Sequence, residues 1–370
     1  MEAARTPRIG GVDVARGIAV LGMFTAHIGN DADLQVGDAS SLLEAFDGRS
    51  AAGFALLAGV SAALLSGGRA PLAGPRLRHA RVRILTRALL LAPLGLALEA
   101  LDTPVIVILP TYAILFAVMA GVVRLRVRAL LVAAAIVLVA APPVVVLARD
   151  TFGTEGPPAP LDLVIGHFYP AAGWIAYLLV GLAVGRLDLR ETAVRWRLVA
   201  VGAAVAVAGH LVNAVAMRAI DESHTLRRAL LTTLPHSSSG VEIAANSGVV
   251  LAVLGLCLMV ADRFPRAVAP VAATGALALT AYCGHLVAIA VIGRELVWQP
   301  DNVTLLAFIG VTLAATWLWR ATLGRGPLER LLHLASTGVA DVVVPDGRAP
   351  TSGATPPGDA EPEPAAPVPG

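Results

Sequence analysis

Long runs of apolar residues, separated by short polar loops, set the pattern of this chain. A helix needs about 20 mostly apolar residues to cross the hydrocarbon core of a bilayer. We therefore predict an all-α fold, a polytopic transmembrane helix bundle of about ten helices. The ten segments are 10–28, 50–66, 84–101, 104–123, 129–148, 171–187, 198–217, 240–261, 268–292 and 303–323.

The distribution of arginine gives this bundle a direction. All 28 basic residues are arginine, a bias that indicates GC-rich coding and a bacterial source. When the loops are numbered alternately from the N-terminus, 22 arginines fall on the N-terminal side and six on the other side. Cytoplasmic loops of membrane proteins carry the excess of basic residues. We therefore expect a multi-pass protein of the plasma membrane with both termini in the cytoplasm.

Composition excludes several classes of function. Hydrophobic residues make up 56% of the chain and charged residues 15%, and the mean hydropathy is +0.75. A soluble domain carries about 25% charged residues, so a long soluble enzyme and a nucleic-acid binder are excluded. The last residues are rich in proline and glycine, and such a composition does not bury a core. We accordingly divide the chain into a transmembrane domain, 1–335, and a disordered cytoplasmic tail, 336–370.

Polar side chains within or beside the apolar segments are candidate functional positions, because ionisable groups in a membrane are costly. Judged by its position along each segment, a large group of these polar residues falls in the outer half or at the outer end. The residues of this group are His27, Asp47, Arg49, Glu99, His210, His236, Asn246, Tyr282 and His285. The sequence therefore predicts an outward-facing site. His27 is its candidate general base, because imidazole titrates near neutral pH.

Structural roles are open for several of these residues. The segment 47–49 fits a turn with an interfacial anchor, and Ser239 with Glu242 fits a helix capping box. Tyr282 and His285 are three residues apart and suit a contact between two helices. No pair of histidines has the short spacing that is typical of a metal site, so we expect none.

Arginines on the inner side are candidates for binding phosphate. A guanidinium group matches phosphate oxygens in geometry and charge, so a cluster of them is predicted to hold a phosphorylated cofactor. The alternative is that these residues only set the membrane orientation. The candidates are Arg16, Arg76, Arg78, Arg81 and Arg83.

Several stretches together resemble a known family. Residues 8–23 contain the pattern R-x-x-x-x-D-x-x-R-G-x-A, and residues 46–49 lead into the second segment. Residues 275–282 with His285 fit G-x-x-A-L-T-x-Y-x-x-H, and residues 326–329 read Gly-Pro-Leu-Glu. The chain is similar in these stretches to bacterial transmembrane proteins related to heparan-alpha-glucosaminide N-acetyltransferase, near the DUF418 group.

The resemblance implies a transmembrane acyltransferase. Such proteins take an acetyl or other acyl group from acyl-CoA in the cytoplasm and pass it to an acceptor on the far side. In the acetyltransferase relatives, an asparagine that ends the first span and a histidine in the following loop are tied to catalysis. Here His27 occupies the asparagine position, and the loop 29–46 contains no histidine.

We therefore expect an acyl-CoA-dependent acyltransferase that acts on a hydroxyl or amine of an extracytoplasmic acceptor, a sugar or glycoconjugate. In this hypothesis His27 removes the acceptor's proton or carries the acyl group, and Arg49 orients the acceptor or stabilises the oxyanion. Asp47 and His285 complete the catalytic set, and the remaining outer residues bind the substrate. The expected partners are the lipid bilayer, acetyl-CoA or another acyl-CoA, and the acceptor, with a homodimer left open. The alternatives are an exporter of a small or lipid-linked substrate and a non-catalytic membrane protein.

Overall fold

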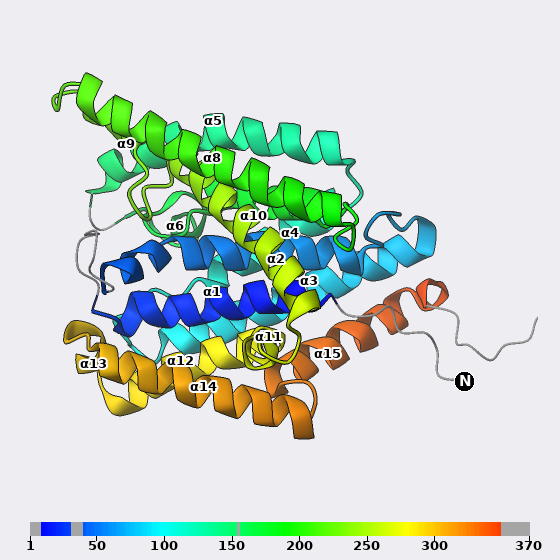
Figure 1. Cartoon of the computed structure of the whole chain (residues 1–370). Coiled ribbons are helices and arrows are strands. Elements are labelled where there is room, and N and C mark those ends of the chain that lie inside the picture. Colours follow the sequence, from blue (N-terminus) through cyan, green and yellow to red (C-terminus); the bar gives the residue numbers. More distant parts are fainter. Residues whose placement is uncertain (1–8, 31–39, 154–155, 349–370) are drawn as a thin grey trace, which may run out of the picture.

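The computed structural model describes residues 9–30, 40–153 and 156–348. Most of its long helices run along one common direction (Figure 1). These are α1 Gly10–Ile28, α2 Arg49–Leu65, α3 Gly74–Glu99, α4 Leu109–Val122, α5 Val127–Phe152, α7 Ala171–Val184, α8 Thr192–Ala219, α10 Gly240–Arg263, α11 Ala269–Ala276, α12 Ala278–Ile292, α14 Asn302–Thr322 and α15 Pro327–Val343. The connections hold the short helices η1 Ser40–Phe46, α6 Asp162–Ile165, α9 Thr225–Leu231, α13 Glu295–Trp298 and η3 Pro345–Gly347. The predicted all-α class is confirmed.

Six helices are long and apolar enough to cross a membrane, namely α1, α2 with its preceding turn, α5, α8, α10 and α14. The bent pair of α11 and α12 is a seventh candidate span. The structure does not test the predicted number of ten spans. Two of the predicted spans correspond to α4 and α7, which have only 14 residues each. In addition, five arginines fall within the first 14 residues of α3. The helices support a polytopic membrane bundle.

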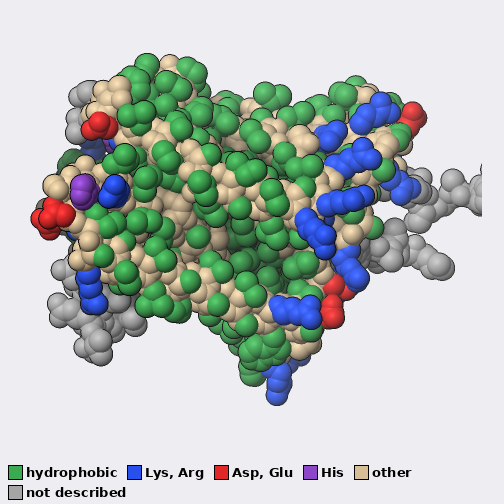
Figure 2. All heavy atoms as spheres, turned by 90° about the horizontal axis from the view of Figure 1, so that it is seen from above, with side chains coloured by type: hydrophobic (Ala, Val, Ile, Leu, Met, Phe, Trp, Pro, Cys, Tyr) green, Lys and Arg blue, Asp and Glu red, His purple; other side chains and the backbone are tan. Residues whose placement is uncertain are grey.

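Burial separates a central helix from peripheral ones. In their most apolar 18 residues, 72% of positions are buried in α1 but only 17% in α8 and 11% in α14. α1 packs against α2, α10, α11 and α14, so it lies in the middle of the bundle. Figure 2 shows a broad band of hydrophobic side chains between the two ends of the molecule, with arginine side chains gathered over one end.

The two ends of the bundle differ in composition. We call the end at which α1 and α3 begin the basic end, because the arginines of α3 lie there. The opposite end, where α1 finishes and α2 and α10 begin, is the site end. A band of apolar side chains between two polar ends is the pattern expected of a protein that spans a bilayer.

The segment 268–292, predicted as one helix, is two. α11 and α12 meet at Leu277 and are bent by 83°. The carboxylate of Glu329 accepts hydrogen bonds from the backbone N–H groups of Leu279 and Thr280, at 2.8 and 3.0 Å. The first N–H groups of a helix have no partner within the helix, so a carboxylate at this point stabilises a new helix start. The prediction of one continuous helix is wrong for this reason.

The C-terminal helix crosses the predicted boundary at residue 335. α15 continues to Val343 and packs against α3. His79 of α3 contacts Asp341 of α15 at 2.9 Å from Nε2 to Oδ1, and Ala340 is fully buried. Residues 336–348 are therefore part of the folded chain in the structure. The rest of the predicted tail, 349–370, lies outside the described residues.

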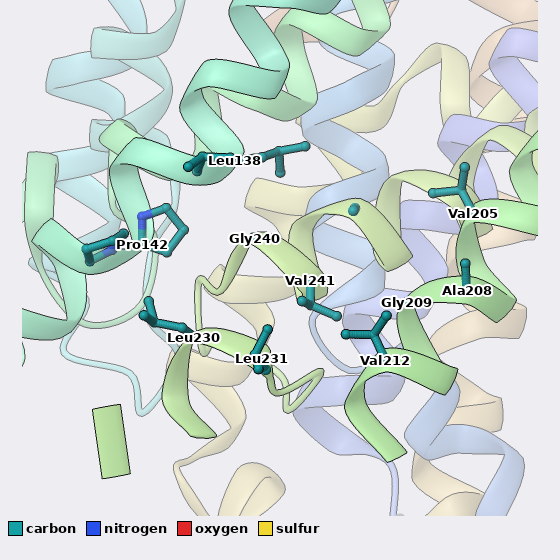
Figure 3. A pocket seen from close by; sticks show the side chains of 13 residues that line it. Leu138, Pro142, Val205, Ala208, Gly209, Val212, Leu230, Leu231, Gly240 and Val241 are labelled. Atoms are coloured by element: carbon teal, nitrogen blue, oxygen red, sulfur yellow. The ribbon is translucent and has the colours of Figure 1, made fainter. Parts of the chain in front are cut away.

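An apolar groove of about 480 Å³ lies between α5, α8, α9 and α10. Figure 3 shows the side chains of Leu138, Val205, Val212 and Leu231 around it. Its lining consists only of apolar side chains and glycines. It therefore offers no group for acid–base chemistry.

Candidate active site

A cavity of about 210 Å³ lies at the site end of the bundle. Seven parts of the chain line it, namely the end of α1, the start of α2 with its preceding turn, the segments before α4, α7 and α10, and the helices α12 and α13. Its polar lining residues are His27, Asp47, Ser50, Tyr169, His236 and Tyr282. Within the part of the chain that the structure describes, no three His, Cys, Asp or Glu side chains gather as a metal ion requires.

His27 stands at the cavity wall and is held by a second histidine. Its Nδ1 lies 3.0 Å from Nε2 of His285, and the two rings are nearly parallel, with an interplanar angle of 12°. The N–H of one imidazole must donate a hydrogen bond to the lone pair of the other, so the two cannot both be fully protonated at this contact. His285 is only 3% exposed and packs against the ring of Phe24. The buried histidine thus fixes the ring of His27.

Asp47 and His236 form a second pair in the same cavity. The Oδ1 atom of Asp47 lies 3.4 Å from Nε2 of His236. Burial lowers the pKa of the His236 imidazole, but the contact with Asp47, the charge of Glu242 and the backbone of Phe168 together outweigh this effect. The pKa of His236 therefore lies above the ordinary value for histidine, and its imidazolium form persists to higher pH.

The loop that carries His236 is clamped from two sides. The Glu242 carboxylate accepts hydrogen bonds from the N–H of His236 (2.9 Å), the hydroxyl of Ser237 (2.9 Å) and the N–H of Ser238 (2.6 Å). Arg149 of α5 donates to the carbonyls of His236 (3.0 Å) and Ser237 (2.7 Å). His236 has a φ of 58°, a conformation that costs a non-glycine residue on the order of 1–3 kcal/mol. The buried clamp therefore holds this histidine in a strained and defined position.

The start of α10 shows half of the predicted capping box. The Ser239 hydroxyl oxygen accepts a hydrogen bond from the N–H of Glu242 at 2.9 Å, as a helix N-cap does. The Glu242 carboxylate, however, bonds to the loop residues before Ser239. The side chain thus serves the cavity loop as well as the helix start.

Aromatic residues close the cavity around these pairs. The ring of Tyr169 lies 5.4 Å from that of His236 and 5.0 Å from that of Trp174. Burial raises the pKa of Tyr169, so its hydroxyl stays protonated at neutral pH and can donate a hydrogen bond. Tyr282 contacts His285 from the same helix, with ring centroids 5.3 Å apart. The cavity therefore combines polar groups with aromatic walls.

The structure brings five of the nine predicted outer residues together: His27, Asp47, His236, Tyr282 and His285. The other four lie apart from the cavity lining. Arg49 donates to the carbonyl of Ala45 at 3.2 Å, and Glu99 is exposed at the end of α3. His210 lies on α8, beside the apolar groove. Asn246 donates to Glu242 at 3.4 Å and supports its carboxylate.

Two contributors were missed by the sequence analysis. Tyr169 lies in a loop before α7 with no motif around it, so its sequence offers no signal. Arg149 is one of only six arginines that the predicted topology places on the sparsely charged side. A basic residue on that side opposes the usual bias. The scarcity of arginine there could have indicated that Arg149 makes specific contacts within the protein.

Arg16, predicted to bind a cofactor, forms hydrogen bonds that connect three helices. Its guanidinium donates to Asp13 (3.0 Å) of α1, to the hydroxyl of Ser61 (2.7 Å) in α2 and to the carbonyl of Gly275 (3.1 Å) in α11. These contacts account for Asp13 and Arg16 in the first sequence motif and Gly275 in the third. The structure thus places Arg16 inside the bundle, apart from the arginines of α3.

The arginines of α3 lie at the basic end. Arg76 and Arg78 are exposed, and Arg81 donates to the carbonyl of Gly121 at 3.3 Å. The Nε atoms of Arg81, Arg83 and Arg87 are buried without a hydrogen-bond partner among the described residues. Buried guanidinium groups normally find acceptors, so these atoms suit an anionic ligand.

Together, the helices and the cavity define a polytopic helical membrane protein with a histidine-lined site at one end. The family model described as "Heparan-alpha-glucosaminide N-acetyltransferase, catalytic" matches residues 8–212, and the chain belongs to this family. The predicted resemblance is confirmed. None of the curated proteins matches the chain. The family match includes His27 and Asp47 but ends before His236, Tyr282 and His285.

Proposed function

We propose that the protein transfers an acetyl or other acyl group from acyl-CoA in the cytoplasm to a hydroxyl or amine of an extracytoplasmic acceptor. The observation that carries this proposal is the cavity in which His27 is held by His285, in a chain of this acetyltransferase family. The acceptor class that fits the family best is a sugar or glycoconjugate. The basic end then faces the cytoplasm, and the site end faces outward.

The transfer needs one proton shuttle. His27 removes the proton from the acceptor's O–H or N–H, and the acceptor atom forms a bond to the acyl carbon. The carbon–sulfur bond of the thioester breaks, and its electron pair goes to sulfur. His27 then returns the proton to the sulfur, which leaves as the CoA thiol. His285 keeps the imidazole of His27 in one orientation throughout, by the 3.0 Å contact between them.

The arginines of α3 are the proposed site for the phosphates of CoA. Arg81, Arg83 and Arg87 have buried Nε atoms without a partner among the described residues, and Arg76 and Arg78 extend the cluster at the surface. Guanidinium groups bind phosphate oxygens through charge-assisted hydrogen bonds. The basic end therefore supplies a place for a polyanionic donor on the proposed cytoplasmic side.

Binding of acetyl-CoA tests this part of the proposal. The purified protein in detergent is expected to bind acetyl-CoA saturably, as measured by isothermal titration calorimetry. Replacement of Arg76, Arg78, Arg81 and Arg83 by glutamine is expected to weaken binding at least tenfold, because each charge-assisted hydrogen bond contributes about 1.5–3 kcal/mol.

The matched control replaces four exposed arginines of the same end by glutamine, namely Arg124, Arg126, Arg128 and Arg197. This variant loses the same charge and is expected to keep its affinity. Equal weakening in both variants would mean that only the overall charge matters. No saturable binding by the wild-type protein would contradict the acyltransferase proposal, and uptake of a substrate by vesicles would then favour an exporter.

Orientation is tested by cysteine labelling in intact cells. Glu222, in the connection after α8, and Glu191, before α8, are both exposed and lie at opposite ends of that helix. A membrane-impermeant maleimide is expected to label Glu222→Cys in intact cells and Glu191→Cys only after permeabilisation. The native Cys257 and Cys283 are buried, so the background is low. Labelling of Glu191→Cys alone in intact cells would show that the protein has the opposite orientation.

A further inference from the structure

The proposed mechanism uses one of the two histidines that line the cavity. When an acceptor attacks a thioester, negative charge develops on the acyl oxygen, and active sites stabilise it with preorganised hydrogen-bond donors. Arg49, which the sequence suggested for this task, donates to the carbonyl of Ala45 and does not line the cavity. The donor must therefore come from another residue of the cavity wall.

We propose that His236, as an imidazolium, donates a hydrogen bond from Nδ1 to the oxyanion that forms on the acyl carbonyl, and that Asp47 positions it by holding Nε2. This inference rests on the proposed acyl transfer. His236 is then a catalytic residue, and Asp47 is a positioning residue. His27 and His236 divide the work, because the first moves the proton and the second stabilises the charge.

The geometry of His236 fits a donor with one free N–H. Its Nε2 lies 3.4 Å from Asp47 Oδ1, so the proton on that nitrogen points to a carboxylate. Its Nδ1 is buried and makes no hydrogen bond of good geometry within the described residues, while the nearby backbone of Phe168 favours the charged form of the ring. A buried polar atom without a partner is costly, and an acyl oxygen in the cavity would supply the missing acceptor. His236 and His27 line the same 210 Å³ space, so both can reach one bound acyl group.

The surroundings of His236 favour its positive form. The nearest charges are the carboxylates of Asp47 and Glu242, and the latter also accepts the backbone N–H of His236. The titratable and charged groups that face it from all the packed elements are His27 of α1, Asp47 before α2, Arg149 of α5, Tyr169 before α7, Glu242 of α10 and Tyr282 of α12. Arg149 binds the backbone carbonyl of His236, so it supports the loop.

The clamped loop explains how the donor is held in place. A hydrogen-bond donor stabilises an oxyanion best when it does not need to reorganise during the reaction. Glu242 and Arg149 bind the N–H and carbonyl of His236, and the residue has a φ of 58°. Strained backbone of this kind is found at functional sites, where the surrounding structure holds it. A helix cap alone does not require this strained backbone at His236, whereas a fixed hydrogen-bond donor does.

Substitution of His236 tests the inference. His236→Gln is expected to lower kcat for release of CoA thiol from acetyl-CoA by about 10²–10³-fold, the usual effect of removing one oxyanion donor. Binding of acetyl-CoA is expected to stay within twofold of the wild type, because the proposed phosphate site is at the other end. The control is His224→Gln, the same substitution at an exposed position of the same end, which is expected to leave kcat unchanged.

The pH profile distinguishes catalysis from a structural role. Since the imidazolium form is the active one, the wild-type rate is expected to fall as pH rises through the raised pKa of His236. Asp47→Asn removes the carboxylate that favours this form, so the fall is expected to begin at lower pH. His236→Gln is expected to lose this alkaline fall altogether. A merely structural role would lower the rate in these variants without moving the profile.

Two failures are distinguishable. Wild-type kcat and an unchanged pH profile in His236→Gln would overturn the role of His236 while leaving the acyltransferase assignment intact. A wild-type protein that neither binds nor consumes acetyl-CoA would overturn the acyltransferase assignment and, with it, this role.

Discussion

His27→Ala is expected to lower the rate of acyl transfer by about 10²–10⁴-fold, the range that general-base catalysis contributes. The imidazole of His27 is the only group of the proposed mechanism that takes the proton from the acceptor. Its loss leaves His285 in place, but that histidine stands behind His27 and is 3% exposed. Transfer is measured as the release of CoA thiol from acetyl-CoA in the presence of an amine or sugar acceptor, and acetyl-CoA binding is expected to survive.

His27→Asn separates two roles of this position. An asparagine restores the residue that the acetyltransferase relatives carry there, but it cannot take a proton. If His27 is the base, His27→Asn loses activity as His27→Ala does. The control is His210→Ala, which removes an imidazole from α8 outside the cavity lining and is expected to be neutral. Full transfer by His27→Ala would defeat the proposed base.

Gly275→Ala is expected to destabilise the protein by about 1–3 kcal/mol, the usual cost of overpacking a core. A Cβ atom on Gly275 would lie 1.8 Å from the carbonyl oxygen of Asp13 and 2.6 Å from the nitrogen of Gly17. These are backbone atoms, so no side chain can turn away and α1 must separate from α11. The Arg16 guanidinium, which bonds to the carbonyl of Gly275, would lose its contact across the two helices. The measurement is the apparent Tm in detergent.

The matched control is Gly284→Ala in the neighbouring α12. A Cβ atom there meets nothing within 4 Å, so the same added methyl group is expected to leave Tm unchanged or raise it slightly, since alanine favours helix more than glycine. Equal Tm values for the two variants would show that the close approach of α1 and α11 is not rigid. A lower Tm for Gly275→Ala alone would support the packing of the first and third sequence motifs against each other.

The site end of the bundle illustrates what depth along a helix can and cannot predict. His27, Asp47 and His285 were placed at the same height from their positions in the apolar segments. The structure brings His27 and Asp47 to one cavity, with His285 in contact with His27 behind the cavity wall. Glu99 and His210 satisfied the same criterion and lie elsewhere. Depth follows from counting residues along one helix. The direction in which a side chain points depends on the rotation of that helix against its neighbours.

The break between α11 and α12 shows a second limit. Residues 268–292 are apolar throughout, and hydropathy alone predicts one helix. The interruption depends on Glu329, which lies about 50 residues further along the chain and binds the first N–H groups of α12. A local pattern contains no sign of a partner so distant in sequence, although residues 326–329 had been recognised as part of a motif.

The sequence by itself determined the class of this protein: a helical membrane protein of the heparan-alpha-glucosaminide N-acetyltransferase catalytic family. Apolar length and motif spacing are properties of short stretches, so they can be read without a structure. Only the tertiary structure decided that His236 and Tyr169 join His27 in one cavity while Arg49 does not. The reason is physical, because the cavity is formed by loops whose course is set by a buried clamp between Arg149 and Glu242, and that clamp exists only once α5 and α10 have packed together.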